Sequence, residues 1–70
     1  MKIIIEAVDG INLESQLRIV LEYVNHCLWV GTPMITKKDS GIKFECGSRR
    51  YHVNCRQTKT TLKFKIWYGV

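Results

Sequence analysis

Acidic residues are scarce in this sequence of 70 residues. Six Asp and Glu stand against eleven Lys and Arg, which gives a formal net charge of +5 at pH 7. Such an excess favours polyanionic partners, namely nucleic acid, an anionic membrane or an acidic protein surface. Solubility alone is the competing explanation, because many small domains carry a net charge of this size. The positions of the charges therefore matter more than their sum.

Long apolar runs are also missing. No stretch approaches the roughly 18 apolar residues of a membrane-spanning helix, and no secretory signal precedes Glu6 and Asp9. The three cysteines, Cys27, Cys46 and Cys55, cannot all pair within one chain. Free thiols persist in a reducing compartment. We therefore expect a soluble protein of the cytoplasm, with no membrane partner.

Signatures of catalysis are missing as well. The sequence has no glycine-rich phosphate loop, no nucleophile elbow and no spacing of carboxylates that predicts a paired acid-base site. Cys46, His52 and Cys55 are metal-ligand types that lie close in sequence, but their spacing matches no zinc-finger pattern. Strand alternation also places the two cysteines on one face and His52 on the other. We expect a protein that is not an enzyme and that has no cofactor and no metal.

What the sequence has is regular alternation, from Ile42 to Val70. Apolar and polar residues alternate at period two in three runs, I-K-F-E-C, Y-H-V-N-C-R and L-K-F-K-I-W-Y. This period is typical of half-buried β-strands. The predicted inward residues are Ile42, Phe44, Cys46, Tyr51, Val53, Cys55, Leu62, Phe64, Ile66 and Tyr68. The predicted outward residues are Lys43, Glu45, His52, Asn54, Arg56, Lys63, Lys65 and Trp67.

Two elements precede these runs. Lys2 to Val8 is rich in isoleucine and predicts a strand, which its consecutive apolar residues place inside the sheet or under the helix end. A helix is predicted from about Leu13 to Val30, between the N-cap Asn12 and the breakers Gly31 and Pro33. Its apolar stripe consists of Leu13, Leu17, Val20, Leu21, Val24 and Leu28.

Between the helix and the alternating runs, Met34 to Lys37 is β-compatible and Lys38 to Gly41 predicts a tight turn. The element order is then β-α-β-β-β-β. It predicts a single two-layer α+β domain over residues 1–70, with one amphipathic helix packed on an antiparallel sheet of four to five strands. The helix stripe and the inward face of the sheet each need a cover, and in a chain this small they cover each other.

The uncovered sheet face suggests a function in nucleic-acid binding. Cations on such a face neutralise phosphates, and an aromatic ring stacks on an unpaired base. The candidate residues are Lys43, Arg49, Arg50, His52, Arg56, Lys63, Lys65 and Trp67. Here Trp67, beside His52, would supply the stacking platform, while Arg49, Arg50 and Lys59 at hairpin tips extend the footprint. The alternative is an ordinary solvated face whose lysines guard the sheet against aggregation.

A second hypothesis is a protein-binding inhibitor or adaptor, of the kind that viruses and mobile elements encode in short chains. Ile19 and Tyr23, with Val30, lie on a helix flank outside the stripe. They form a protein interface or a homodimer contact, unless the sheet or the segment from Thr32 to Thr36 covers them. Trp29 projects on the polar side, where it either packs under the next turn or anchors a partner.

Overall fold

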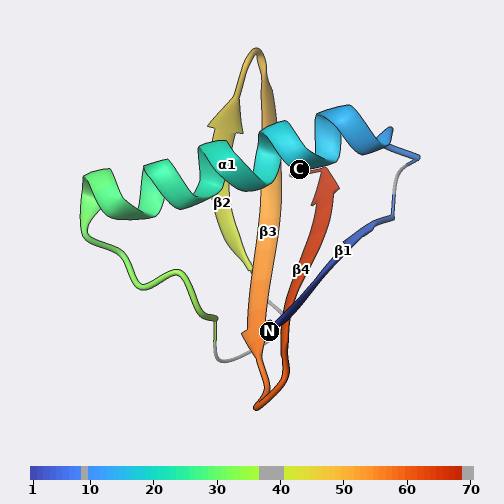
Figure 1. Cartoon of the computed structure of the whole chain (residues 1–70). Helices are drawn as coiled ribbons and strands as arrows, with labels where there is room; N and C mark the ends of the chain where they lie inside the picture. Colours follow the sequence, from blue (N-terminus) through green and yellow to red (C-terminus); the bar gives the residue numbers. More distant parts are fainter. Residues whose placement is uncertain (9, 37–40, 69–70) are drawn as a thin grey trace.

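The fold is one helix lying on one face of a sheet, as Figure 1 shows for this computed structural model. The structure describes residues 1–8, 10–36 and 41–68. The elements in chain order are β1 (Lys2–Ala7), α1 (Leu13–Val30), β2 (Ile42–Cys46), β3 (Arg49–Gln57) and β4 (Thr61–Tyr68). The predicted α+β class is confirmed, with four strands in the sheet.

The sheet has the strand order β1-β4-β3-β2. Its hairpins β2-β3 and β3-β4 are antiparallel, whereas β1 pairs in parallel with β4, so the sheet is mixed rather than wholly antiparallel. Over the residues that the structure describes, β1 lies at the edge of the sheet beside β4, so its predicted placement inside the sheet is wrong. The reason is visible in Figure 1: α1 carries the chain across to the far edge, and the hairpins then fill the sheet back toward β1.

The predicted short strand at Met34 to Lys37 does not form over the residues that the structure describes there, 34–36. Thr36 instead meets β3 beyond the end of β2, where its N–H donates to the Cys55 carbonyl at 2.8 Å. Lys37 and residues 38–40 of the predicted turn lie outside the described residues.

The predicted bounds of the helix are confirmed. The Asn12 side chain accepts a hydrogen bond from the Ser15 N–H at 2.8 Å, which satisfies one of the donors that every helix start leaves open. At the other end, Gly31 adopts the left-handed conformation at φ 72° and its N–H bonds to the Cys27 carbonyl. The helix therefore begins and ends at the residues that cap it.

The inward face of the sheet is also confirmed. Phe44, Tyr51, Val53, Cys55, Phe64 and Ile66 are buried, and Ile42, Cys46, Leu62 and Tyr68 are partly buried against the same core. Strand parity was sufficient to assign all ten, because a half-buried strand alternates strictly between its two faces.

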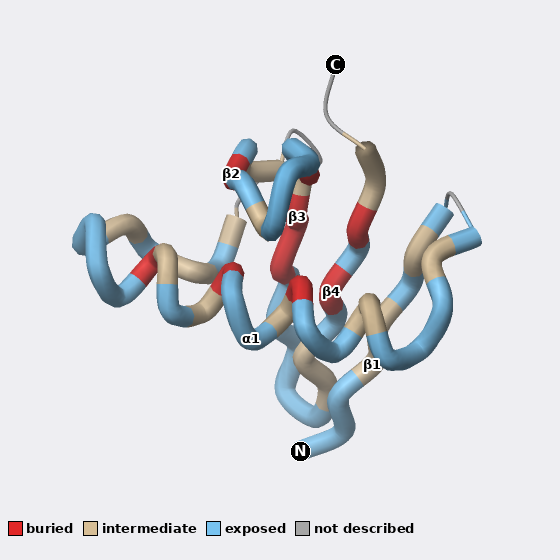
Figure 2. The backbone as a smooth tube through the Cα atoms, turned by 90° about the horizontal axis from the view of Figure 1, so that it is seen from above, coloured by how far each residue is buried: buried red, intermediate tan, exposed pale blue. Residues whose placement is uncertain are grey.

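The helix buries a different face from the predicted one. Ile19, Tyr23 and Cys27 form its buried stripe (Figure 2). The Tyr23 ring meets Phe44 and Phe64 edge to face, with centroids 5.6 and 6.3 Å apart, and its hydroxyl donates to the Met34 carbonyl at 2.7 Å. The predicted apolar stripe does not form the contact with the sheet, so that prediction is wrong. Its four leucines are 50 to 77% exposed, namely Leu13, Leu17, Leu21 and Leu28.

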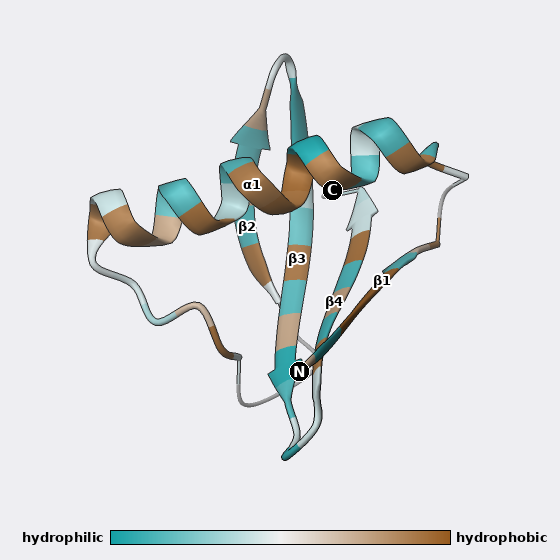
Figure 3. Cartoon of the chain, in the orientation of Figure 1, coloured by the Kyte–Doolittle hydropathy of each residue, from teal (hydrophilic) through white to brown (hydrophobic). Residues whose placement is uncertain are grey.

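Two geometric causes explain this exposure. At 100° per residue, the apolar side chains from Ile19 round to Leu21 cover about 200° of the helix, more than one sheet contact can bury. Figure 3 shows hydrophobic segments recurring along the whole of α1. The helix is also about 27 Å long, whereas four strands span only about 15 Å between the outer axes. Since α1 crosses the strands steeply, its C-terminal end overhangs β2 (Figures 1 and 2).

Candidate nucleic-acid interface

The strand register brings the predicted outward residues together on the sheet face opposite α1, which we call the outer face. His52 of β3 pairs with Lys43 of β2 on one side and with Trp67 of β4 on the other. Two rungs further along, Arg56 pairs with Lys63, and Lys65 lies between these rungs, opposite Asn54. The exposed cations on this face include Lys43, Arg56, Lys63 and Lys65.

Trp67 lies across the middle of the outer face. A β-carbon built on Gly41 would come within 2.8 Å of Trp67 Cη2, so the indole reaches from β4 over β3 to the residue before β2. Its centroid is 5.2 Å from that of the His52 ring. Asn54, on the same side of β3, is only 3% exposed. The indole is thus half-buried against its own sheet, a more restricted arrangement than the open stacking platform expected from the sequence.

This packing gives a first prediction, for Gly41→Ala. Gly41 has φ +64°, and the new methyl would meet the Trp67 ring and the Val53 carbonyl oxygen, 3.2 Å from that carbon. We expect a loss of roughly 2–4 kcal/mol in the free energy of unfolding, measured by urea denaturation. Gly31→Ala is the matched control, since Gly31 has φ +72° with open space around the same position, and it should cost only about 1 kcal/mol. Equal losses in the two variants would contradict the placement of Trp67.

Carboxylates on the outer face neutralise part of its charge. Lys63 Nζ lies 3.1 Å from Glu6 Oε1, and Arg50 Nε lies 3.2 Å from Glu45 Oε1. All four side chains are well exposed, so each pair contributes at most about 1 kcal/mol to stability and opens easily. Positive charge still predominates on the face, which carries Lys43, Arg56 and Lys65 besides these pairs.

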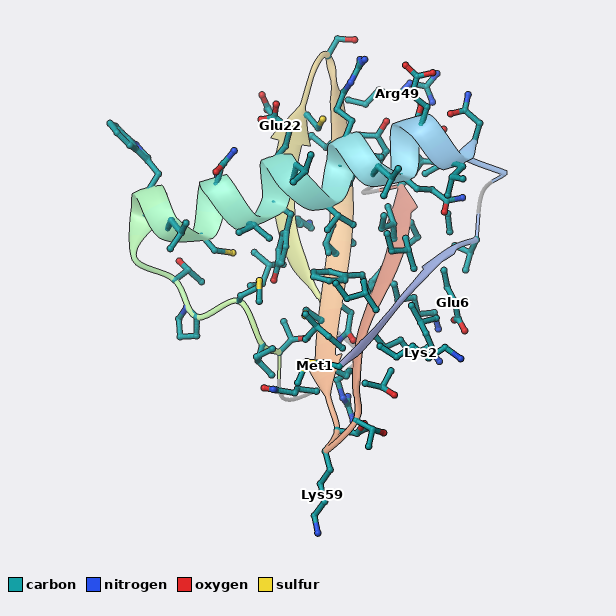
Figure 4. All side chains as sticks on the ribbon, in the orientation of Figure 1. Met1, Lys2, Glu6, Glu22, Arg49 and Lys59 are labelled. Carbon is teal, nitrogen blue, oxygen red and sulfur yellow. The ribbon has the colours of Figure 1, made fainter. Side chains whose placement is uncertain are left out.

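The two predicted extensions of the footprint lie apart from each other. Arg49 pairs with Cys46, on the helix side of the sheet, and its guanidinium carbon lies 4.9 Å from the centroid of the Tyr68 ring. Figure 4 shows Arg49 and Lys59 at opposite ends of the molecule. Arg50 is on the outer face, so the structure separates Arg49 from the other candidate residues.

The residues predicted to form a protein interface differ in their exposure to solvent. Ile19 is buried and Tyr23 is 0% exposed, so both belong to the core and are not accessible to a partner, because the sheet covers the flank on which they lie. Trp29 is 89% exposed, and it does not pack under the turn that follows the helix. Of these candidates, Trp29 is the accessible aromatic side chain.

The thiols are ill suited to nucleophilic chemistry. Burial, and next the proximity of Cys27, raises the pKa of the Cys55 thiol to about 11, so it is protonated at neutral pH. Burial likewise raises the pKa of Cys46. Over residues 1–8, 10–36 and 41–68, no three His, Cys, Asp or Glu side chains are grouped so that they could hold a metal ion. None of the described helices is long and apolar enough to cross a membrane.

One surface was not singled out from the sequence. A groove of about 430 Å³ opens between α1 and β1. Its lining is wholly apolar and consists of Ile3, Ile5, Leu17, Val20, Leu21, Val24, Met34, Leu62 and Phe64. The signal that could have revealed it is an excess of apolar residues: three consecutive isoleucines in β1 and a helix arc wider than one contact needs.

Comparisons with known proteins do not indicate a function for this chain. No family model matches the sequence. No curated protein is similar to it at a significant level. No solved structure matches the fold at that level either.

Proposed function

We propose that this protein is a small, non-enzymatic nucleic-acid-binding module that uses the outer face of its sheet. The observation that carries the proposal is the register, which gathers Lys43, Arg56, Lys63 and Lys65 on the same face as Trp67. Cations held by neighbouring strands stay at fixed spacings, and each one that meets a phosphate releases condensed counterions. Binding of this kind depends on charge and shape rather than on base sequence.

The role of Trp67 in this proposal is limited by its packing. Its indole rests on Gly41 and β3, so the ring offers a nucleobase only the surface that these contacts leave open. A base would therefore stack on one face of the ring, while the surrounding cations supply most of the affinity. We place this activity in the cytoplasm, the compartment in which three free cysteines stay reduced.

A salt-titrated binding assay tests the proposal. Fluorescently labelled single-stranded RNA, single-stranded DNA and duplex DNA are each titrated with the protein, and the anisotropy is followed at increasing salt. We expect binding at about 50 mM salt and a linear fall of log K with log salt, with a slope of roughly −3 if four cations meet phosphates. Absence of binding to all three probes, or affinity that does not change with salt, would overturn it.

The exposure of Trp29 favours a second candidate function, that of a protein-binding inhibitor or adaptor. An exposed tryptophan at the overhanging end of a helix is a suitable anchor for a partner, because tryptophan is enriched among the residues that dominate interfaces. A pull-down from lysate before and after nuclease treatment distinguishes the two candidates. Partners retained after nuclease but lost with Trp29→Ala favour the adaptor, and partners lost with the nucleic acid favour the first function.

A further inference from the structure

The exposed side of α1 carries a row of apolar side chains. Leu13, Leu17, Leu21 and Leu28, which we call the leucine stripe, are each at least half exposed. Scattered apolar residues on a surface are normal, whereas four leucines in line on one helix form a contiguous patch. A contiguous apolar patch of this kind favours burial against a partner.

The leucine stripe continues into the groove between α1 and β1. Leu17 and Leu21 belong to both, and Ile3 of the edge strand β1 forms the opposite wall. The stripe is a ridge and the groove beside it a hollow of about 430 Å³. A partner that contacts both the leucine stripe and the groove must itself carry an apolar ridge beside an apolar groove.

The spacing of the apolar residues identifies such a partner. Val20 and Val24 join the four leucines at positions 13, 17, 20, 21, 24 and 28, and this series has the same spacings when it is read backwards. A two-fold axis between positions 20 and 21 would therefore superpose the series on itself. We propose that a second copy of this chain docks here, with its α1 antiparallel to the first, in an isologous dimer.

In this dimer each apolar residue meets an apolar residue. Leu13 lies against Leu28 of the partner subunit, and Leu17 lies against Val24 of the partner subunit. The ridge of each subunit enters the groove of the other. Five side chains exposed by half or more, the leucine stripe and Ile3, amount to an apolar surface on the order of 500 Å², a large part of the roughly 800 Å² that each partner buries in a standard interface.

The charge distribution is compatible with this pairing. The net positive charge of the chain is not carried by α1, whose charged residues Glu14, Arg18 and Glu22 sum to −1 with histidine neutral. The basic outer face lies on the other side of the sheet from α1. Two copies that meet through their helices keep the basic faces apart, and they present two such faces outward. The interface does not depend on the proposed nucleic-acid binding, so either can fail alone.

Sedimentation equilibrium and light scattering on the full chain, from about 1 to about 100 µM, test the dimer. We expect the wild type to be dimeric at the upper concentrations and both Leu21→Glu and Leu17→Glu to be monomeric, with unchanged circular dichroism because each side chain is exposed. Asn25→Glu adds the same charge on the polar side of α1 and should stay dimeric. A monomeric wild type at 100 µM, or dimeric leucine variants, would overturn the proposal.

Cysteine cross-linking tests the antiparallel geometry. In a Cys46→Ser background, which removes the one partly exposed native thiol, Leu21→Cys lies beside the axis and should form a disulfide between identical subunits. Leu13→Cys alone should not cross-link, but it should link to Leu28→Cys when the two variants are mixed. A disulfide formed by Leu13→Cys alone indicates parallel helices, and failure of both expected links would likewise reject the arrangement.

Discussion

Replacing Tyr23 by alanine should cost the fold about 4 kcal/mol or more in the free energy of unfolding. The ring is fully buried between Phe44 and Phe64, and aromatic-to-alanine changes in a core cost roughly 3–5 kcal/mol. The variant also removes the hydroxyl donor of the Met34 carbonyl. A domain of this length has a total stability of only roughly 4–10 kcal/mol. We therefore expect Tyr23→Ala to lose a large fraction of the stability of the fold.

The matched control for this prediction is Trp29→Ala, on the same helix. Trp29 is larger than Tyr23 but almost fully exposed, so its loss should change the free energy of unfolding by no more than about 0.5 kcal/mol. Urea denaturation followed by circular dichroism measures both variants without relying on tryptophan fluorescence. Similar losses in the two, or a small loss in Tyr23→Ala, would show that α1 packs on the sheet through another face.

The second large effect concerns binding. The double variant Lys43→Gln and Lys65→Gln removes one cation from β2 and one from β4, on either side of β3. If both meet phosphates, the magnitude of the salt slope should fall by about 1.5 and the affinity for single-stranded nucleic acid by roughly 30-fold at low salt. Both side chains are exposed, so the stability of the fold should be retained.

Arg18→Glu is the control for charge alone. It lowers the net charge from +5 to +3, as the double variant does, but it acts on α1, on the other side of the sheet from the outer face. At about 0.1 M salt we expect its affinity and salt slope to stay within about twofold of the wild type, because exposed charges beyond a Debye length of roughly 10 Å are then largely screened. An equal loss in both proteins would mean that net charge rather than the outer face governs binding.

The sheet could be predicted from the sequence and the helix contact could not, for physical reasons. A strand has only two faces, so the alternation in Ile42 to Tyr68 assigns every side chain once the hairpins keep register. A helix presents a continuous circumference. When apolar residues cover about 200° of it, periodicity identifies the arc but not which half is buried.

Two side chains of α1 explain which half of its apolar arc is buried against the sheet. Tyr23 carries a polar hydroxyl that satisfies a carbonyl of the chain after the helix, and Cys27 is a small residue that fits closely over the sheet. Neither ranks above leucine by hydrophobicity. The edge position of β1 was likewise invisible to local patterns, because it depends on where the last strand of the chain returns.

The sequence predicted most of the residues of the candidate site, but it did not predict how their side chains pack. Parity placed Lys43, His52, Lys65 and Trp67 on one face, and the register agrees. It could not predict that Trp67 folds down over β3 onto Gly41, because that contact joins residues far apart in sequence. Arg49 was predicted at a hairpin tip, but β3 begins at Arg49, and alternation from Tyr51 then places Arg49 on the helix side.

Residue-by-residue NMR on the 15N-labelled chain locates the surface that contacts nucleic acid. The chain is titrated with an unlabelled single-stranded oligonucleotide at low salt, and amide shifts are followed to saturation. We expect the largest changes on the outer face, at Lys43, Arg56, Lys63, Lys65 and the indole N–H of Trp67, while the leucine stripe stays unchanged. Shifts concentrated on α1, or no shifts at an excess of oligonucleotide, would contradict it.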